Sequence, residues 1–417
     1  MGNIRLARLR CASWLDNGPL APHVASYKQY LTDRGYAAHT IGTCMISIAH
    51  FAQWLQGSRL RVQRIDEAAL CQFLDAHLPR CRCNGAVYRD RRGLSAALGH
   101  LLVVLRAQSI IGPPSVSTTP VDQELRRYDE HMDHVRGLAP NTRDMGLRTV
   151  RRLLVARFGD GAIDIAAIKP DQVRRFFAQQ AKLHRKPVNT RSVVTALRSY
   201  FRYRTSLGDA VHGLIGAVSY PANWQLASLP KTLTSAEVAQ LVGSLGGLGS
   251  ALLRSDAIVR CALDLGLRSG EIARLGLDDI DWRAGTITLR HTKGRRVDVL
   301  PLPATTGEAI AAYLKHERPI TRHRGLFARR VAPREQLVGP DLVRKTIRQA
   351  YARAGLPYTR SHLLRHTMAN RLLAGGSSLK EVADVLRHRS LNTTLIYAKL
   401  DSRNLGAVAL PWPGSAP

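Results

Sequence analysis

Residues 361–388 read SHLLRHTMANRLLAGGSSLKEVADVLRH and predict two successive amphipathic helices. In the first helix His362 and Arg365 are three residues apart, so they share a face. The opposite face is apolar and can be buried, since it carries Leu363, Leu364, Met368, Leu372 and Leu373. The second helix begins at the capping-box pair Ser378 and Glu381. Cations on one helix face are typical of a basic surface, but they also occur where a protein handles phosphate.

Two more polar residues follow this stretch closely. The second helix should end near His388, and SLNTTLIYAKL, residues 390–400, predicts a further helix. Asn392 is a suitable N-cap, which places Tyr397 about one turn into that helix.

Two basic residues precede the stretch. A long apolar helix should stop at Gly266, and Arg268 follows directly, so its guanidinium can project into a cleft. The stretch GTITLRHTKGRRVDVLPLP, residues 285–303, alternates as a β-hairpin does and places Lys293 at the turn.

Together these residues are of the types that phosphoryl transfer without a metal requires. Attack on a phosphodiester builds negative charge on its non-bridging oxygens, and fork-shaped, permanently charged arginines suit a clamp on them. An acid must protonate the leaving oxygen, and further donors must hold the pentacoordinate phosphate. Each residue alone has an ordinary explanation, because a single arginine means little in a basic protein. The order in which all of them occur favours a phosphoryl-transfer site over an ordinary basic surface.

Four segments in this order resemble the motif boxes of the tyrosine recombinases, the phage-integrase family: LGLRSGEIARLGLDDIDW, HTKGRRVDVLPLP, SHLLRHTMANRLLAGGSSLKEVADVLRH and TTLIYAK. The resemblance runs from about residue 232 to 400. Residues 120–220 resemble the helical core-binding domain of that family, less specifically.

The resemblance implies roles for the residues that match. Tyr397 would attack the scissile phosphate, form a 3′-phosphotyrosyl bond and free a 5′-hydroxyl. Arg268 and Arg365 would clamp the phosphate, and Lys293 would be the general acid for the leaving oxygen. No cofactor, ATP or metal is implied for the reaction, because the covalent bond stores the phosphodiester energy.

The remaining matches carry supporting roles and one departure. His362 would assist proton transfer at the tyrosine or bind phosphate, and His388 would donate to a non-bridging oxygen. Glu271 matches a position that usually supports the site. The family usually has Leu-Gly-His where this chain has Arg387 before His388. Since arginine does not easily adopt the left-handed backbone that glycine allows, we expect a different helix end, or a DNA contact by Arg387.

The composition points to the same class of partner. The 417 residues include 61 basic and 31 acidic ones, a net charge of +30. A charge that high repels itself unless a polyanion is bound, so nucleic acid is the expected partner. No apolar run approaches the length of a membrane span, and the N-terminus lacks a signal-peptide core. We therefore expect no membrane association and a cytoplasmic, nucleoid-associated protein.

Two loop-like stretches, residues 112–120 and 219–232, divide the chain. The last segment opens with a capping box at Thr234 and Glu237. The predicted domains are an N-terminal helical domain (1–112), a helical DNA-binding domain of the core-binding type (120–219) and a catalytic domain (232–417).

The first two domains are interpreted as copies of one unit. Residues 27–55 parallel residues 128–158, because each has a helix led by tyrosine, an Arg-Gly end, a turn with threonine and a second helix. Further along, two pairs of apolar positions align: Ile65 with Ile168, and Phe73 with Phe176. The predicted fold is mainly α, with two helical DNA-binding domains followed by a mixed α/β catalytic domain that contains a small antiparallel sheet.

Cations interleaved with aromatic residues follow the helices of the second domain. Such faces suit the phosphate backbone of double-stranded DNA, although a solvated basic surface looks the same. The candidate DNA contacts there are Arg151, Arg152, Arg174, Arg175, Arg191, Arg198, Arg202 and Arg204.

A group of possible zinc ligands lies in the first domain: Cys71, His77, Cys81 and Cys83. Their spacing matches no standard zinc pattern, so the sequence favours free, partly buried thiols over a metal site.

These features predict a site-specific DNA recombinase of the integrase or transposase type. It would act on double-stranded DNA that carries specific sites, through a Holliday junction, as a homo-tetramer or as a hetero-tetramer with partner recombinases. A mobile element such as a transposon is the expected setting. Two alternatives stay open: a dimer-resolving recombinase of the Xer type, and a sequence-specific DNA-binding accessory or regulatory protein that does not cleave.

Overall fold

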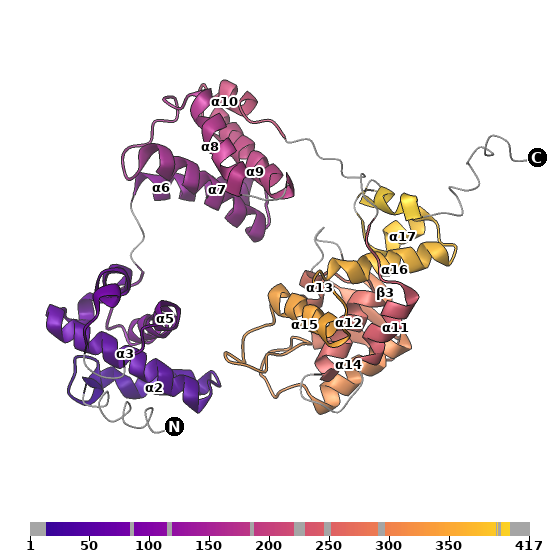
Figure 1. The fold of residues 1–417 in the computed structure, drawn as a ribbon, viewed down its shortest axis with the longest axis horizontal. Helices are drawn as coiled ribbons and strands as arrows, with labels where there is room; N and C mark the ends of the chain where they lie inside the picture. The colour runs from indigo at the N-terminus through magenta and orange to yellow at the C-terminus, as the bar shows by residue number, and fades with distance from the viewer. Residues whose placement is uncertain are drawn as a thin grey trace, which may run out of the picture. The chain divides into compact units, whose positions relative to one another are not determined.

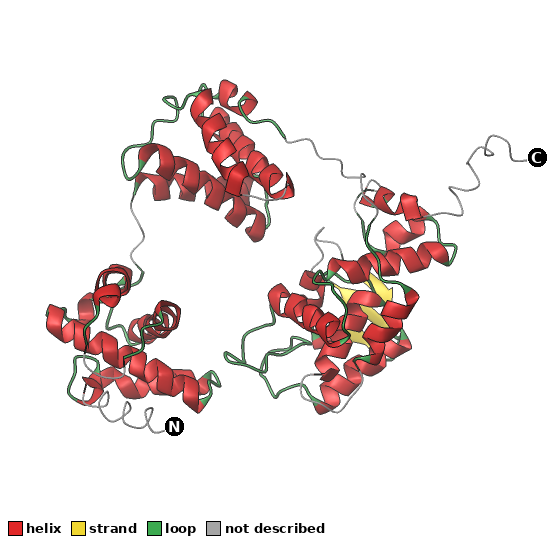
Figure 2. Cartoon of the chain, in the orientation of Figure 1, coloured by secondary structure: helices red, strands yellow, loops and turns green. Residues whose placement is uncertain are grey.

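The computed structural model describes residues 14–83, 87–114, 119–183, 187–220, 230–245, 252–290, 297–388, 390 and 393–400. Contacts divide the chain into two compact units. The first unit comprises residues 1–113 together with 228–417, and the second unit comprises residues 114–227. The described residues are mainly helical, as predicted, and their strands lie in the C-terminal part of the chain (Figure 1, Figure 2).

The N-terminal helices enclose one apolar core. They are η1 (Ala21–His23), α2 (Val24–Asp33), α3 (Ala38–Ser58), η2 (Val62–Arg64), α4 (Glu67–Cys71), the π-helical η3 (Gln72–His77), η4 (Leu78–Arg80) and α5 (Arg91–Ala107). Helix α3 packs on α5, and most of its C-terminal half is buried. Tyr27 of α2 reaches α5, where its hydroxyl donates to the carbonyl of Ala97 at 2.9 Å.

The second unit has its own core. Its helices are α6 (Pro120–Glu130), η5 (His131–Val135), α7 (Pro140–Phe158), α8 (Pro170–Leu183), α9 (Pro187–Ser206) and α10 (His212–Gly216). Helix α7 packs on α6 and on α9. Tyr128 of α6 donates to the hydroxyl of Ser199 in α9 at 2.9 Å.

These two sets of helices are built alike. The four aligned positions Ile65, Ile168, Phe73 and Phe176 are all buried. In each set, a buried tyrosine of the leading helix also bonds the last long helix, about 70 residues further along the chain. The duplication itself stays a prediction.

The C-terminal part combines helices with a small sheet. Its elements are α11 (Ser235–Gly243), α12 (Leu252–Leu263), α13 (Ser269–Arg274), η6 (Leu277–Asp279), β1 (Ile280–Asp281), β2 (Thr286–Leu289), β3 (Asp298–Pro301), α14 (Ala304–His316), α15 (Pro340–Arg353), α16 (His362–Ala374), α17 (Leu379–Val385) and η8 (Leu395–Leu400). The strands are antiparallel in the order β1-β2-β3, and Ile287 pairs with Leu300. The predicted hairpin is therefore confirmed, although residues 291–296 at its turn lie outside the described part of the chain.

Two cores support the C-terminal part. The larger one centres on α12, which packs on α14, α15 and α16. The smaller one lies under α16, α17 and η8, and comprises Ala369, Leu373, Val382, Leu386 and Tyr397. Both predicted capping boxes form, at Thr234 and at Ser378. Tyr397 lies on a 3-10 helix, and the predicted cap Asn392 is outside the described residues.

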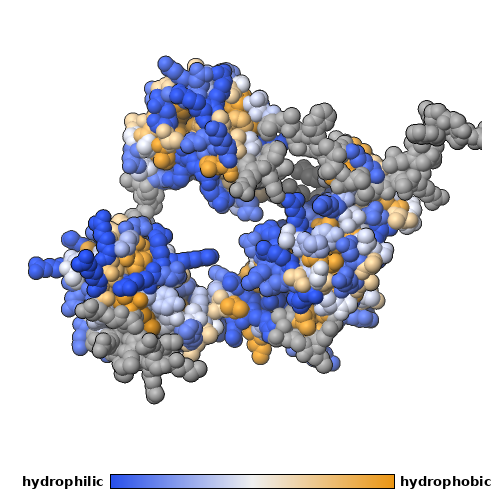
Figure 3. Space-filling model, in the orientation of Figure 1, coloured by the Kyte–Doolittle hydropathy of each residue, from blue (hydrophilic) through white to orange (hydrophobic). Residues whose placement is uncertain are grey.

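Hydrophilic residues cover most of the described surface on the face drawn in Figure 3, and apolar residues occur there in small patches. None of the helices among the described residues has the length and apolarity needed to cross a membrane.

Candidate active site

Arg365 joins the loops that carry the other predicted site residues. It lies in α16, is 4% exposed, and donates from Nη1 to the carbonyl of Gly266 and from Nη2 to the carbonyl of Leu386. The first carbonyl precedes Arg268 by two residues, and the second precedes His388 by two residues. One guanidinium therefore positions the turn after α12 and the turn after α17.

The turn before Arg268 needs glycine at residue 266. Gly266 has φ +57°, and a Cβ there would lie 2.6 Å from Sδ of Met368 and 2.9 Å from Cδ2 of Leu386. Any other residue here would strain the backbone and require the side chains of Met368 and Leu386 to shift. The predicted helix stop is thus also the point where α16 packs against the turn.

Glu271 holds Arg268 at the start of α13. Its Oε2 accepts from the backbone N–H of Arg268 at 2.8 Å, and its Oε1 accepts from Nη1 of the same residue at 2.7 Å. The side chain of Glu271 is 3% exposed, whereas that of Arg268 is 25% exposed. The carboxylate is thus buried behind an arginine that still reaches solvent.

Arg387 pairs with the same carboxylate and departs from our expectation. Its φ is 55°, so the helix ends in the left-handed turn that glycine would make, and the expected change of the helix end is wrong. Nη2 of Arg387 donates to Oε2 of Glu271 at 3.1 Å, Nη1 donates to the carbonyl of Val385 at 3.0 Å, and the side chain is 6% exposed. The buried guanidinium holds this turn from inside the protein.

Two opposing effects set the pKa of Glu271. Burial raises it, but Arg387, and then the backbone N–H and guanidinium of Arg268, outweigh the burial, so the pKa of Glu271 is lowered overall. The carboxylate is therefore ionised at neutral pH and can hold both arginines.

The hydroxyl of Tyr397 is bonded to a histidine that sequence reasoning left unassigned. Tyr397 is 2% exposed, and its hydroxyl lies 2.6 Å from Nδ1 of His366. When Nδ1 carries no proton, the tyrosine donates and the imidazole accepts. His366 lies four residues after His362 in α16, and its ring is 6.4 Å from that of His362. The i, i+4 spacing was the signal that placed it on the same face.

His388 has a partner that was also missed. Its Nδ1 lies 2.7 Å from Oγ1 of Thr394, a buried residue just before η8. This contact orients the ring and leaves Nε2 available for another group. The spacing of Thr394 carries no signal in the sequence, because only the turn after α17 brings it to His388.

The charged groups of the site shift one another's pKa values. Burial, then Arg268 and Arg387, lower the pKa of Arg365 to about 9. Burial raises the pKa of Tyr397, while Arg365 and Arg268 oppose that rise. Partial desolvation, then Arg365 and Arg268, lower the pKa of His362, whose side chain is exposed on one side. A bound anion would compensate the positive charges of this cluster.

Lys293 lies outside the described residues, so its position relative to this cluster stays a prediction. The structure brings together the other matched residues of the motif boxes: Arg268, Glu271, His362, Arg365, His388 and Tyr397.

The candidate DNA-contacting arginines of the second unit differ in their surroundings. Arg175 and Arg202 are exposed, and Arg191 and Arg198 lie over the ring of Tyr220. The other exposed ones have polar partners: Arg151 with Asp122, Arg152 with Gln180, and Arg174 with Asp171. Arg204 differs, since Glu124 and Asp209 hold its largely buried guanidinium inside the unit.

Acidification should destabilise the region around α16 and η8. Burial, then His362 and Arg365, lower the pKa of His366 to about 4, and burial, then Arg365, lowers that of His388 to about 4, from an ordinary 6.5. Between these values the unfolded chain binds more protons, so stability falls as the pH drops from about 6.5 to about 4. The protection factors for hydrogen exchange in peptides from residues 362–374, which correct the measured rates for the intrinsic effect of pH, should fall across this range. His366→Asn should flatten the trend, and an unchanged trend in that variant would contradict the assignment.

Comparison with known proteins agrees with the fold. The model of the family described as "Phage integrase family" matches residues 231–403. An integrase/recombinase of Sinorhizobium fredii, y4rA, is 37% identical over 405 residues, which cover 96% of each chain. The tyrosine recombinase XerC of Rhizobium meliloti is 31% identical over 312 residues, covering 71% of this chain and 92% of its own.

A solved structure shows the same fold. Lambda integrase (residues 75–356), as a dimer bound to a COC′ core site, is 15% identical and matches with a TM-score of 0.51. The match covers 67% of this chain and 94% of the integrase chain. The family model and the relatives at 37% and 31% identity define the class of protein, enzymes that cut and rejoin DNA. The chain belongs to the phage-integrase family of tyrosine recombinases, site-specific enzymes that cut and rejoin DNA.

Proposed function

We propose that Tyr397 attacks the scissile phosphate of a specific DNA site, with Arg268 and Arg365 as the clamp on the phosphate. The supporting observation is the hydrogen bond between the hydroxyl of Tyr397 and His366. Arg365 and Arg268 also lower the pKa of that hydroxyl against the effect of burial. A tyrosine hydroxyl is a weak nucleophile until its proton has an acceptor. The neighbouring imidazole supplies that acceptor.

The Tyr397 oxygen bonds to phosphorus, and its proton passes to Nδ1 of His366. The bond from phosphorus to the 5′-oxygen breaks, and Lys293 gives a proton to that oxygen, which leaves as a 5′-hydroxyl. The free imidazole of His366, with a pKa of about 4, is a poor base. The negative charge of bound DNA raises that pKa and makes the transfer easier.

The other residues hold the phosphate and the clamp. Nε2 of His388 donates to a non-bridging oxygen, since Thr394 occupies its Nδ1. His362 faces the arginines and binds phosphate beside them. Glu271 and Arg387 keep Arg268 in place and do not touch DNA. No cofactor enters the reaction, because the 3′-phosphotyrosyl bond stores the phosphodiester energy for rejoining.

DNA contacts by the second unit fit this role. The exposed arginines on α7, α8 and α9 neutralise backbone phosphates and give affinity without sequence choice. Arg204 and Arg387 are not among these contacts, because both are buried against carboxylates.

Strand exchange then needs four subunits on two duplexes and passes through a Holliday junction. The subunits are four copies of this chain or include partner recombinases. The reaction takes place where the DNA is, in the cytoplasm at the nucleoid.

The biological setting is a mobile element. The likeness to the integrase/recombinase y4rA extends over 96% of this chain, whereas the likeness to XerC covers 71% of it. The likeness to y4rA therefore includes a part of this chain that the likeness to XerC does not cover. Such an additional part suits the ends of an element better than a dimer-resolution site.

A suicide substrate tests the chemistry and the setting together. Duplexes nicked next to the cleavage position trap the covalent intermediate, because the short released strand diffuses away. We expect a protein–DNA adduct with the ends of the chain's own element, and none with a dimer-resolution site of the host chromosome. The adduct should form in EDTA and disappear in Tyr397→Phe.

The matched control is Tyr88→Phe, at an exposed tyrosine of the N-terminal part. It should form the adduct as wild type does. An adduct that survives in Tyr397→Phe, or wild type that forms none on the element ends, would overturn the proposed chemistry. An adduct on the dimer-resolution site alone would overturn the setting.

A further inference from the structure

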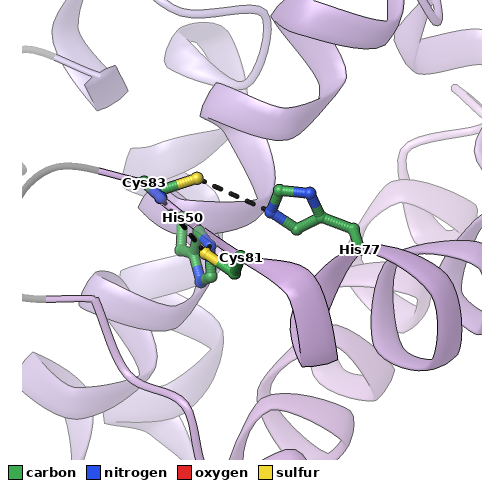
Figure 4. A group of neighbouring side chains, drawn as sticks. All are labelled: His50, His77, Cys81 and Cys83. Atoms are coloured by element: carbon green, nitrogen blue, oxygen red, sulfur yellow. Dashed lines mark hydrogen bonds between the residues drawn. The ribbon is translucent and has the colours of Figure 1, made fainter.

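Four side chains of the N-terminal helices converge on one point. They are His50 of α3, His77 at the end of η3, and Cys81 and Cys83 in the loop that follows η4 (Figure 4). One ligand atom from each lies within 4.8 Å of those of the other three. Nε2 of His50 is 3.2 Å from Sγ of Cys81, and Nε2 of His77 is 3.5 Å from Sγ of Cys83.

These separations are close to those around a tetrahedral zinc ion. With Zn–S bonds of about 2.3 Å and Zn–N bonds of about 2.0 Å, neighbouring ligand atoms of a tetrahedron lie about 3.3 to 3.8 Å apart. The pair of His77 and Cys83, at 3.5 Å, meets this spacing, and the pair of His50 and Cys81, at 3.2 Å, lies just below it. Shifts of about 1 Å in the loop would bring the widest pair within it.

The surroundings favour a metal over free thiols. The backbone N–H of Cys83 points at Sγ of Cys81 at 3.4 Å, which stabilises negative charge on that sulfur. His50 is fully buried, and Phe73 packs against the rings of both His50 and His77 at about 5 Å. A polar histidine is buried in such an apolar wall only when it has a strong partner.

Cys71, one of the four possible ligands considered from the sequence, is not part of this group. Cys71 is exposed, whereas His50, twenty-one residues earlier in the chain, takes the fourth position. The set of possible zinc ligands considered from sequence included Cys71, which the structure places outside this group, and lacked His50. Spacing could not reveal His50, because α3 reaches the loop only through the packing of the helical core.

We propose that His50, His77, Cys81 and Cys83 bind one zinc ion that ties the loop after η4 to α3. Two imidazoles and two thiolates form a closed set with no open position, which is typical of structural rather than catalytic zinc. The ion would fix the segment that leads from η4 into α5. The stability of the N-terminal core, rather than DNA cleavage, would depend on it.

A redox role for the cysteines fits the site less well. Sγ of Cys81 faces Nε2 of His50 at 3.2 Å and Sγ of Cys83 faces Nε2 of His77 at 3.5 Å, so each sulfur is directed at an imidazole nitrogen. A metal ion is the partner that would bring both sulfurs to the thiolate form.

Metal content of the full-length chain tests the proposal. Protein purified from zinc-supplemented medium should contain about one zinc per chain after dialysis. Cys83→Ser should lose most of it, and so should His50→Ala. Cys71→Ser is the matched control, because it removes a nearby cysteine that lies outside the group, and it should keep the metal.

A second readout covers variants that fold poorly. Cobalt(II) added to metal-free wild type should give the intense visible bands of a tetrahedral site and a thiolate-to-cobalt charge-transfer band. Removing zinc from wild type should speed hydrogen exchange in residues 72–83 and leave exchange in residues 362–374 unchanged. Wild type that contains no zinc and gives no cobalt spectrum would overturn the proposal. Loss of the metal in Cys71→Ser, with retention in His50→Ala, would overturn the ligand set.

Discussion

Arg365→Lys should slow cleavage of a suicide substrate by about 10²- to 10³-fold, although the positive charge remains. Arginine reaches two carbonyls at once, those of Gly266 and Leu386, through the two ends of its planar fork. A lysine ammonium is a compact point charge and cannot span both. The turns that carry Arg268 and His388 would then lose their common anchor.

The same variant should loosen the region locally. Each buried carbonyl that loses its donor costs about 1 to 3 kcal/mol. Hydrogen exchange in α16 and α17 should therefore accelerate, while exchange in the second unit stays unchanged. Measuring cleavage in single turnover separates the chemical step from product release.

Arg371→Lys is the control for this substitution, since Arg371 lies on the same helix and is exposed. It should cleave within about twofold of wild type, as surface substitutions usually do. If Arg365→Lys cleaved as fast as wild type, the two carbonyl contacts would not position the site.

The sequence was most informative where local rules decide the structure. The capping boxes at Thr234 and Ser378 and the hairpin of β2 and β3 depend on residues a few positions apart, and all three form as predicted. The prediction was less accurate around Tyr397, because the tyrosine lies on a 3-10 helix held by the smaller core. Packing against α16 and α17 fixes that segment more than its own propensity does.

Contacts between distant segments were the part that could not be predicted. The bonds from His366 to Tyr397 and from His388 to Thr394 cross a turn whose geometry depends on Arg387. For Arg387 we expected a different helix end or a DNA contact, because arginine does not easily adopt a left-handed backbone. The burial of its side chain depends on Glu271, which is 116 residues earlier in the chain. No local pattern links the two.

Arg387→Gly should destabilise wild type but stabilise the Glu271→Gln variant. In wild type the glycine removes one partner of Glu271, and relief of the left-handed backbone, worth about 1 to 2 kcal/mol, only partly offsets that loss. In Glu271→Gln the buried carboxylate charge is absent, and Arg387 becomes a buried charge without compensation. Breaking a buried pair in this way costs about 3 to 5 kcal/mol. Removing Arg387 then relieves the strain and the uncompensated charge together.

The two single variants and the double variant form a cycle that isolates the pair. We expect a coupling of about 3 to 5 kcal/mol in the local opening free energies of α13 and α17, measured by hydrogen exchange. The pair Lys380 and Asp384 on α17 is the control, because both side chains are mostly exposed and its coupling should stay below about 0.5 kcal/mol. Effects of the same sign for Arg387→Gly in both backgrounds would show that Arg387 does not act through Glu271. The expected reversal of sign would instead explain how this chain keeps an arginine where its family usually has glycine: the carboxylate that holds Arg268 also compensates the cost of the left-handed turn before His388.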